Sequence, residues 1–222
     1  MFSVIFEVHP KTDKYDTYLG LARMLRPELE QLEGFVDNIR YGSLTREGWI
    51  LSLSNWRDEK ALVRWRTKQH HHETQERGRN EVLADYHLRV GQVTKDTNVP
   101  EGCELKEQRL DMTETGSGTF ITLVNGHHSL DWVKSTDPAE VARWLGLKET
   151  ASGLVEWDVF QAILTPGDVI LLMSWQNPGA GEAFGSEIAI KNVERLRSVR
   201  VVRDYGMFDR REAPQYYPEK HR

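Results

Sequence analysis

The strongest constraint on this chain is a weak internal repeat with a constant offset of 119 residues. The positions that recur at this offset are Gly34 and Gly153, Trp56 and Trp175, Ala61 and Ala180, Val82 and Val201, and the pairs Asp85-Tyr86 and Asp204-Tyr205. A period of this length is far longer than the roughly 20–50 residues of a solenoid repeat. The 222-residue chain is therefore predicted to hold two copies of one small domain, each of about 90 residues.

Each copy has the pattern of a βαββαβ unit, the ferredoxin-like or split βαβ motif. Leu19, Ala22, Leu25 and Leu29 have the three- and four-residue spacing of an amphipathic helix, and Gly34 is suited to end it. In the first copy we expect strands over 2–8, 35–43, 49–56 and 85–93, and helices over 15–33 and 57–79. In the second copy we expect strands over 120–125, 155–164, 168–175 and 198–207, and helices over 138–147 and 181–195.

These elements divide the chain into four segments. Residues 1–93 form the first ferredoxin-like repeat, and residues 118–209 form the second. The stretch 94–117 is polar, lacks clean periodicity and contains Pro100 and Gly102, which is typical of a linker. Residues 210–222 are predicted to form an extended tail.

A four-stranded sheet with both helices on one face needs a cover for its other face. The strands WILSLS and VILLMSW are apolar on both sides, which indicates burial on both sides. The natural cover is the sheet of the other copy. The sequence therefore predicts an α+β fold in which two ferredoxin-like repeats pack sheet to sheet as an α+β barrel.

The charge and cysteine content exclude several classes of protein. A net charge of −5 offers no basic excess for a nucleic-acid backbone. One cysteine, Cys103, excludes an internal disulfide framework and a multi-cysteine metal site. No apolar run approaches the roughly 18 residues of a membrane span, and MFSVIFEVHP lacks the features of a signal peptide. We expect a cytoplasmic protein without nucleic-acid or membrane partners, either a monomer with an internal pseudo-dimer or a homodimer.

One motif extends from the second predicted helix into the last strand of the first copy. It reads W-R-x4-H-x3-Q-x2-G-R followed by D-Y-x-L-R-V, and its residues are Trp65, Arg66, His71, Gln75, Gly78, Arg79, Asp85, Tyr86, Leu88, Arg89 and Val90. The chain resembles the antibiotic biosynthesis monooxygenase (ABM)-like family of the dimeric α+β barrel superfamily, in a tandem two-copy form. The likeness is good over 2–93 and fainter over 118–209. It implies that one chain supplies both halves of a barrel that other members form by dimerising.

A run of three histidines, His70-His71-His72, lies in this motif. Consecutive helical residues point in different directions, so the three cannot ligate one metal ion. His72 follows Trp65 by seven residues and continues its apolar stripe, whereas the family motif matches His71. Either histidine is a candidate base, and the alternative is a polar helix end with one partly buried histidine. In haem-degrading relatives, the histidine that ligates the iron lies about ten residues after the tryptophan. In this chain that position is occupied by Gln75.

The candidate site falls into two groups. The candidate catalytic residues are His71, His72, Trp65 and Asn38. The candidate pocket residues are Trp56, Tyr86, Arg40, Gln75, Asn125 and Trp175. Asn38 or Asn125 would donate a hydrogen bond to a substrate oxygen, although Asn125 also fits a simple turn, and Trp65 also fits a core position. No metal site and no cofactor-binding motif is predicted.

The resemblance implies three functions, which the sequence leaves open. The first is a cofactor-independent monooxygenase that oxygenates a small aromatic or polycyclic substrate in an apolar pocket, without metal or flavin. The second is a haem-binding or haem-degrading protein. The third is a non-catalytic protein that binds a small aromatic ligand or serves in a stress response.

Overall fold

Two sets of strands and helices follow each other along the chain, and the computed structural model describes residues 1–187, 192–218 and 220 of it. The first set comprises β1 (Phe2–Pro10), α1 (Tyr15–Glu30), β2 (Phe35–Ser43), β3 (Ile50–Trp56), α2 (Glu59–Arg66), α3 (Gln69–Arg77), the π-helical turn η1 (Gly78–Val82) and β4 (Leu83–Asp96). The second comprises β5 (Phe120–His127), α4 (Leu130–Ser135), α5 (Pro138–Trp144), β6 (Leu154–Ala162), β7 (Asp168–Trp175), α6 (Pro178–Glu187) and β8 (Arg195–Gly206). The division into segments 1–93, 94–117, 118–209 and 210–222 stays a prediction.

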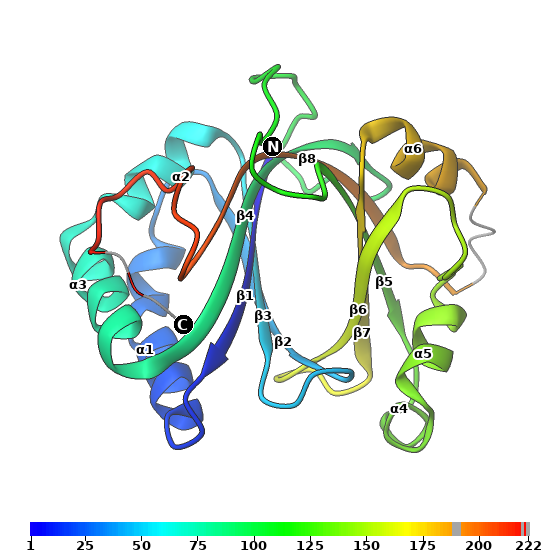
Figure 1. The fold of residues 1–222 in the computed structure, drawn as a ribbon, viewed down its shortest axis with the longest axis horizontal. Helices are drawn as coiled ribbons and strands as arrows, with labels where there is room; N and C mark the ends of the chain where they lie inside the picture. Colours follow the sequence, from blue (N-terminus) through cyan, green and yellow to red (C-terminus); the bar gives the residue numbers. More distant parts are fainter. Residues whose placement is uncertain (188–191, 219, 221–222) are drawn as a thin grey trace.

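The strands form one closed antiparallel barrel in the order β1-β3-β2-β6-β7-β5-β8-β4. Figure 1 shows α1, α2 and α3 outside the half that holds β1 to β4, and α4, α5 and α6 outside the other half. This arrangement confirms the predicted α+β barrel of two ferredoxin-like units. Among the described residues, no helix combines the length and the apolar character that crossing a bilayer requires.

The two halves meet along two seams of unequal length. One seam pairs β2 with β6 only from Tyr41 to Ser43. The other pairs β4 with β8 from His87 to Asp96, and its register shifts at Gly91. The long seam joins the last strand of each half, so it provides most of the hydrogen bonds that close the barrel.

The barrel interior is mainly apolar. Its cluster contains Ile5, Leu53, Ile121, Leu172 and Val199, among others, and each of these is at most 2% exposed. Apolar burial of this kind is the main source of folding free energy. Side chains alternate along each strand, so the neighbouring positions face the helices outside.

A buried ion pair lies among these apolar side chains. Arg89 donates to the carboxylates of Glu7 and Glu156 and to the hydroxyl of Ser174. Burial acts to raise the pKa of Glu7, but the charges of Arg89 and Arg46 outweigh it and hold that pKa below its ordinary value. Glu7 is therefore ionised inside the barrel, and its arginine partners compensate the cost of burying it.

The helices differ from the sequence prediction more than the strands do. The helix predicted over 57–79 is two helices, because Lys68 between α2 and α3 has an extended backbone with ψ of 132°. Asp58 caps α2 by accepting from the Ala61 amide. The helix predicted over 138–147 is preceded by α4, which the sequence did not indicate. The prediction over 181–195 ran too far, since β8 begins at Arg195 and residues 188–191 lie outside the described part.

The seams provide a test of barrel closure. A Cβ atom on Gly91 would lie 2.4 Å from the Val199 side chain and 2.6 Å from the Arg200 carbonyl oxygen, across the long seam. We expect Gly91→Ala to lower the free energy of unfolding by about 1–3 kcal/mol, the usual cost of overpacking. Gly42 on the short seam has no atom within 4 Å of such a Cβ, so Gly42→Ala is the matched control.

Urea unfolding of both variants, followed by circular dichroism, measures the difference. Gly42→Ala is expected to stay within about 1 kcal/mol of the parent. Equal stability of the Gly91→Ala variant and the parent would show that β4 and β8 are not as close as described.

Candidate functional site

A cavity of about 230 Å³ lies between the first-half helices and the outer face of the sheet. Its walls come from α1, α2, α3 and η1 on one side and from β1 to β4 on the other. Two further contributions come from distant parts of the chain: Arg203 and Tyr205 of β8, and the segment 207–218, which we call the C-terminal segment. This segment lies beside α2 and α3 (Figure 1).

Most of the predicted site residues lie around this one cavity. Those that line it are Asn38, Arg40, Trp56, Trp65, His71, Gln75 and Tyr86. His72, Asn125 and Trp175 are not among the lining residues. The structure thus brings the first-copy candidates together, with the exception of His72, and leaves the second-copy candidates elsewhere.

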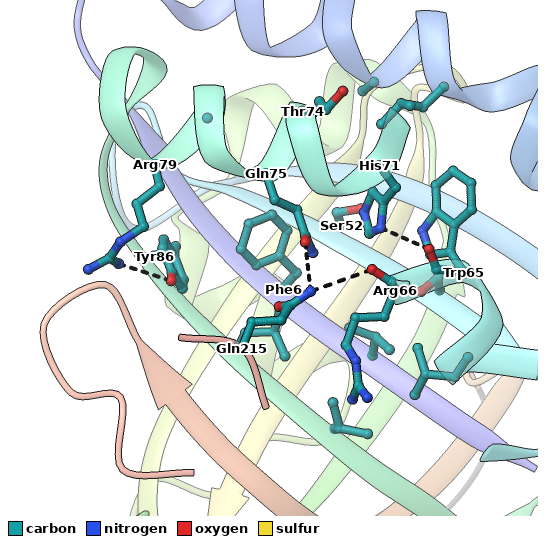
Figure 2. Close-up of a pocket in the computed structure, with 18 of the residues that line it drawn as sticks. Phe6, Ser52, Trp65, Arg66, His71, Thr74, Gln75, Arg79, Tyr86 and Gln215 are labelled. Atoms are coloured by element: carbon teal, nitrogen blue, oxygen red, sulfur yellow. Dashed lines mark hydrogen bonds between the residues drawn. The ribbon is translucent and has the colours of Figure 1, made fainter. Parts of the chain in front are cut away.

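His71 is held against Trp65. The two rings stack with centroids 4.4 Å apart and an interplanar angle of 22°. The Nδ1 atom of His71 lies 3.2 Å from the Trp65 carbonyl oxygen, a contact drawn in Figure 2. Because a carbonyl oxygen only accepts, Nδ1 carries the ring proton in the neutral form and Nε2 carries the lone pair. His71 is therefore oriented as a base or hydrogen-bond acceptor.

His72 lies on the outside of the same helix. It is exposed, and its ring stacks on Tyr217 with centroids 5.8 Å apart. The seven-residue spacing from Trp65 pointed to His72 because it assumes one continuous helix. The break at Lys68 divides this helix into α2 and α3, so the apolar face of α2 does not continue to His72. The family motif, which matched His71, identified the histidine that lines the cavity.

Burial lowers the pKa of His71 to about 4, against an ordinary value of 6.5. The contacts of the ring with backbone carbonyls of Trp65 and Arg66 oppose this shift but do not cancel it. The imidazole is therefore neutral at pH 7, with its lone pair on Nε2.

The hydrogen bonds of the Asn38 side chain differ from the expected ones. Its amide nitrogen donates to the Ser52 hydroxyl at 3.1 Å and to the Leu53 carbonyl at 3.3 Å. Both N–H groups are thus used within the sheet, and Asn38 offers the cavity an acceptor rather than the predicted donor. Ser52 accepts from Asn38, lines the cavity and retains its own O–H for donation. Sequence reasoning missed this serine, which is one of two in β3.

Asn125 and Trp175 have structural roles on the other side of the barrel. Asn125 accepts from Arg197 at 2.8 Å. Trp175 donates from its indole nitrogen to Thr122 at 3.0 Å and packs on Phe184, with ring centroids 4.9 Å apart. Trp175 is the repeat counterpart of Trp56, and in the second half it packs within a cluster of buried apolar side chains.

The cavity wall carries a strong excess of positive charge. Its arginines are Arg40, Arg66, Arg79, Arg203 and Arg210, and its one carboxylate is Glu59. That carboxylate is already paired with Arg109 at 2.8 Å. A chain with a net charge of −5 thus surrounds an apolar cavity with guanidinium groups. This combination favours a ligand that is apolar over most of its surface and carries a negative charge.

Several of these residues were missed by the sequence analysis. Arg79 lay within the family motif but was assigned no role. Arg203, Tyr205, Arg210, Gln215 and Tyr217 reach the cavity from β8 and the C-terminal segment. Among the residues with described positions, no group of three or more histidine, cysteine, aspartate or glutamate side chains is gathered around a common point for a metal ion.

Comparisons with known proteins fit this geometry. The model of the antibiotic biosynthesis monooxygenase family matches residues 1–77. The chain is 49% identical to the jasmonate monooxygenase ABM of Pyricularia oryzae over 224 residues, which cover 98% of this chain and 99% of that protein. The chain therefore belongs to the antibiotic biosynthesis monooxygenase family.

Solved structures give weaker matches. An anthrone oxidase-like protein is 11% identical, with 96% of each chain covered and a TM-score of 0.38. A conserved protein from Methanosarcina mazei is 22% identical, with 40% of this chain and 88% of that chain covered and a TM-score of 0.38. The family assignment rests on the sequence relative.

The low pKa of His71 predicts a specific pH dependence. Between about pH 6.5 and pH 4 the unfolded chain binds a proton at this position that the folded chain does not bind. The free energy of unfolding therefore falls as the pH drops through this window, by on the order of 3 kcal/mol in total. NMR titration of the His71 ring should give a midpoint near pH 4.

The matched variant is His71→Gln. The difference in unfolding free energy between parent and variant, measured by urea at several pH values, should fall between pH 6.5 and pH 4 and level off below. A midpoint near 6.5, with no change in that difference, would contradict the burial of this ring.

Proposed function

We propose that this protein is an oxygenase that acts on a small cyclic carboxylic acid, with jasmonate as the first candidate. The observation that supports this most is the cavity wall, where five arginines surround apolar side chains beside a neutral histidine. A relative that is 49% identical over almost the whole chain is named a jasmonate monooxygenase, which supports the same substrate class.

The chemistry of jasmonate suits this wall. The molecule is a cyclopentanone with a hydrocarbon chain and one carboxylate, so it combines an apolar body with a single negative charge. A neutral polycyclic substrate would offer these arginines no negative charge. We therefore narrow the small aromatic or polycyclic substrate predicted from the sequence to a cyclic acid.

We assign the role of base to His71. Its Nε2 lone pair would accept a proton from a C–H group next to a carbonyl, and the enolate that forms would stabilise the imidazolium as an ion pair. The Ser52 hydroxyl is positioned on the cavity wall to donate to a developing oxyanion. Trp65 holds the ring in place through the stack and through the carbonyl that accepts from Nδ1.

We propose a reaction that uses neither a metal ion nor a flavin. The number of electrons that the substrate supplies then determines the product. A substrate that supplies all four electrons for the reduction of O₂ turns a CH₂ group and O₂ into a carbonyl group and water. Insertion of one oxygen atom into a C–H bond instead yields an alcohol and water and requires two electrons and two protons from a separate donor. The mass of the product distinguishes these two reactions.

The direct test incubates the purified full chain with jasmonate and follows oxygen uptake and product mass. We expect oxygen consumption that depends on jasmonate. His71→Gln should lower kcat by about 10²–10⁴, the usual contribution of general acid–base catalysis. His72→Gln is the matched control and should behave like the parent, because His72 lies outside the cavity. Equal turnover by the His71→Gln variant and the parent would remove His71 from the reaction.

The same preparation separates the two alternatives. A haem-binding protein would give a Soret band after haem addition, and that band would be lost in His71→Ala. A non-catalytic protein would bind jasmonate without oxygen uptake under any condition.

We further propose that one chain forms a complete site in the cytoplasm. The lining residues that one chain contributes from both halves and from the C-terminal segment support a site within one chain. The single cysteine, which is free, is compatible with a reducing compartment.

A further inference from the structure

Two arginine side chains meet on one oxygen atom at the edge of the cavity. Arg79 donates to the Tyr86 hydroxyl at 3.2 Å, and Arg210 donates to the same hydroxyl at 2.5 Å. Arg79 belongs to η1 and is 3% exposed, whereas Arg210 belongs to the C-terminal segment. All three side chains line the cavity.

Within the described part of the chain, the hydrogen bonds of both guanidinium groups end on uncharged oxygens. Arg79 also donates to the carbonyls of Met207 at 2.9 Å and Pro218 at 3.1 Å. Arg210 also donates to the carbonyl of Gln215 at 2.8 Å. An arginine as buried as Arg79 is usually paired with a carboxylate. Here two like charges converge, and an anion beside them would relieve their repulsion.

An aromatic ring helps to hold these charges together. Arg79 and Arg210 lie 5.7 and 5.1 Å from the centroid of the Tyr217 ring, within the range of a cation–π contact. Such a contact stabilises a cation without neutralising it. The cluster is therefore built to stay in place while it keeps its positive charge.

Tyr86 supplies the third group. Its oxygen accepts from both arginines, so its own hydrogen is directed to another partner. A carboxylate accepts up to four hydrogen bonds and matches the planar fork of a guanidinium group. We propose that Arg79, Arg210 and Tyr86 form a carboxylate clamp that binds the charged end of the substrate. This inference rests on the proposed function and names the group that the site recognises.

The position of the clamp sets the orientation of the substrate. His71 and Arg79 are eight residues apart on α3 and η1, roughly 12 Å along the helix axis. Figure 2 shows the His71–Trp65 pair and the Arg79–Tyr86 pair on opposite sides of Gln75. A carboxylate at the clamp thus directs the uncharged end of the molecule toward His71.

The clamp also gives the C-terminal segment a role in binding. Besides Arg210, the segment supplies Gln215, which donates to Gln75 at 3.1 Å and to the Arg66 carbonyl at 3.4 Å. These contacts fix the segment to the ends of α2 and α3, as Figure 2 shows. Removal of one charge from this segment should therefore change which ligands bind.

The test compares acids with their uncharged methyl esters. The pairs are jasmonate and methyl jasmonate, and phenylacetate and methyl phenylacetate, with binding measured by titration calorimetry at fixed salt. We expect the parent to bind each acid at least tenfold more tightly than its ester. Arg210→Gln should reduce this preference about tenfold and leave ester affinity unchanged. Arg211→Gln is the matched control, because this substitution removes the same charge one residue away. The Arg211 side chain is exposed and paired with Asp209.

A second variant keeps the test valid if Arg210→Gln fails to fold. Tyr86→Phe removes only the hydroxyl and should weaken acid binding several-fold, with unchanged ester binding. Circular dichroism checks that both variants are folded. The clamp is wrong if the parent prefers no acid over its ester, or if both folded variants keep the full preference. Acid preference that depends on Arg210, without oxygen uptake, would support the clamp and contradict the proposed oxygenase function. Turnover of jasmonate, together with variants that keep the full preference for the acid, would support the proposed oxygenase function and contradict the clamp.

Discussion

Each half of this protein has a four-stranded sheet with helices on one face, and the rest of the structure depends on burying the other face. Burial is achieved when the two sheets close into one barrel, which places Ile5, Leu53, Ile121 and Leu172 in a common apolar interior. The pairing of β4 with β8 completes this closure. Because the inner faces pack against each other in the barrel, the cavity described above lies between the sheet and the helices.

The sequence predicted the strands well because alternation and glycine positions determine them locally. Strand β2 begins and ends as predicted, and Gly34 has the expected positive φ, 87°. The helices were predicted less well. The break at Lys68 depends on how α2 and α3 fit over the sheet, and no local pattern marks it. The choice between His71 and His72 depended on this break, so periodicity alone pointed to the wrong side.

The candidate site was predictable only where one copy of the repeat forms it. Trp65, His71, Asn38 and Tyr86 belong to the first copy and line one cavity. Arg210 and Gln215 come from a segment without a counterpart in the repeat, so the 119-residue offset could not reveal them. Asn125 was predicted from its place near the end of a first strand, and Trp175 is the repeat counterpart of Trp56, but neither residue lines the cavity.

The route of β8 has a further consequence. This strand belongs to the second half, yet Arg203 and Tyr205 near its end lie in the cavity of the first half. The cavity wall therefore includes residues from both strands of the long seam. Any molecule that binds the closed barrel and not an opened one shifts the equilibrium toward closure by mass action. Ligand affinity and the cohesion of the two halves are thus thermodynamically linked, and a substitution that loosens the seam will weaken binding without touching the ligand.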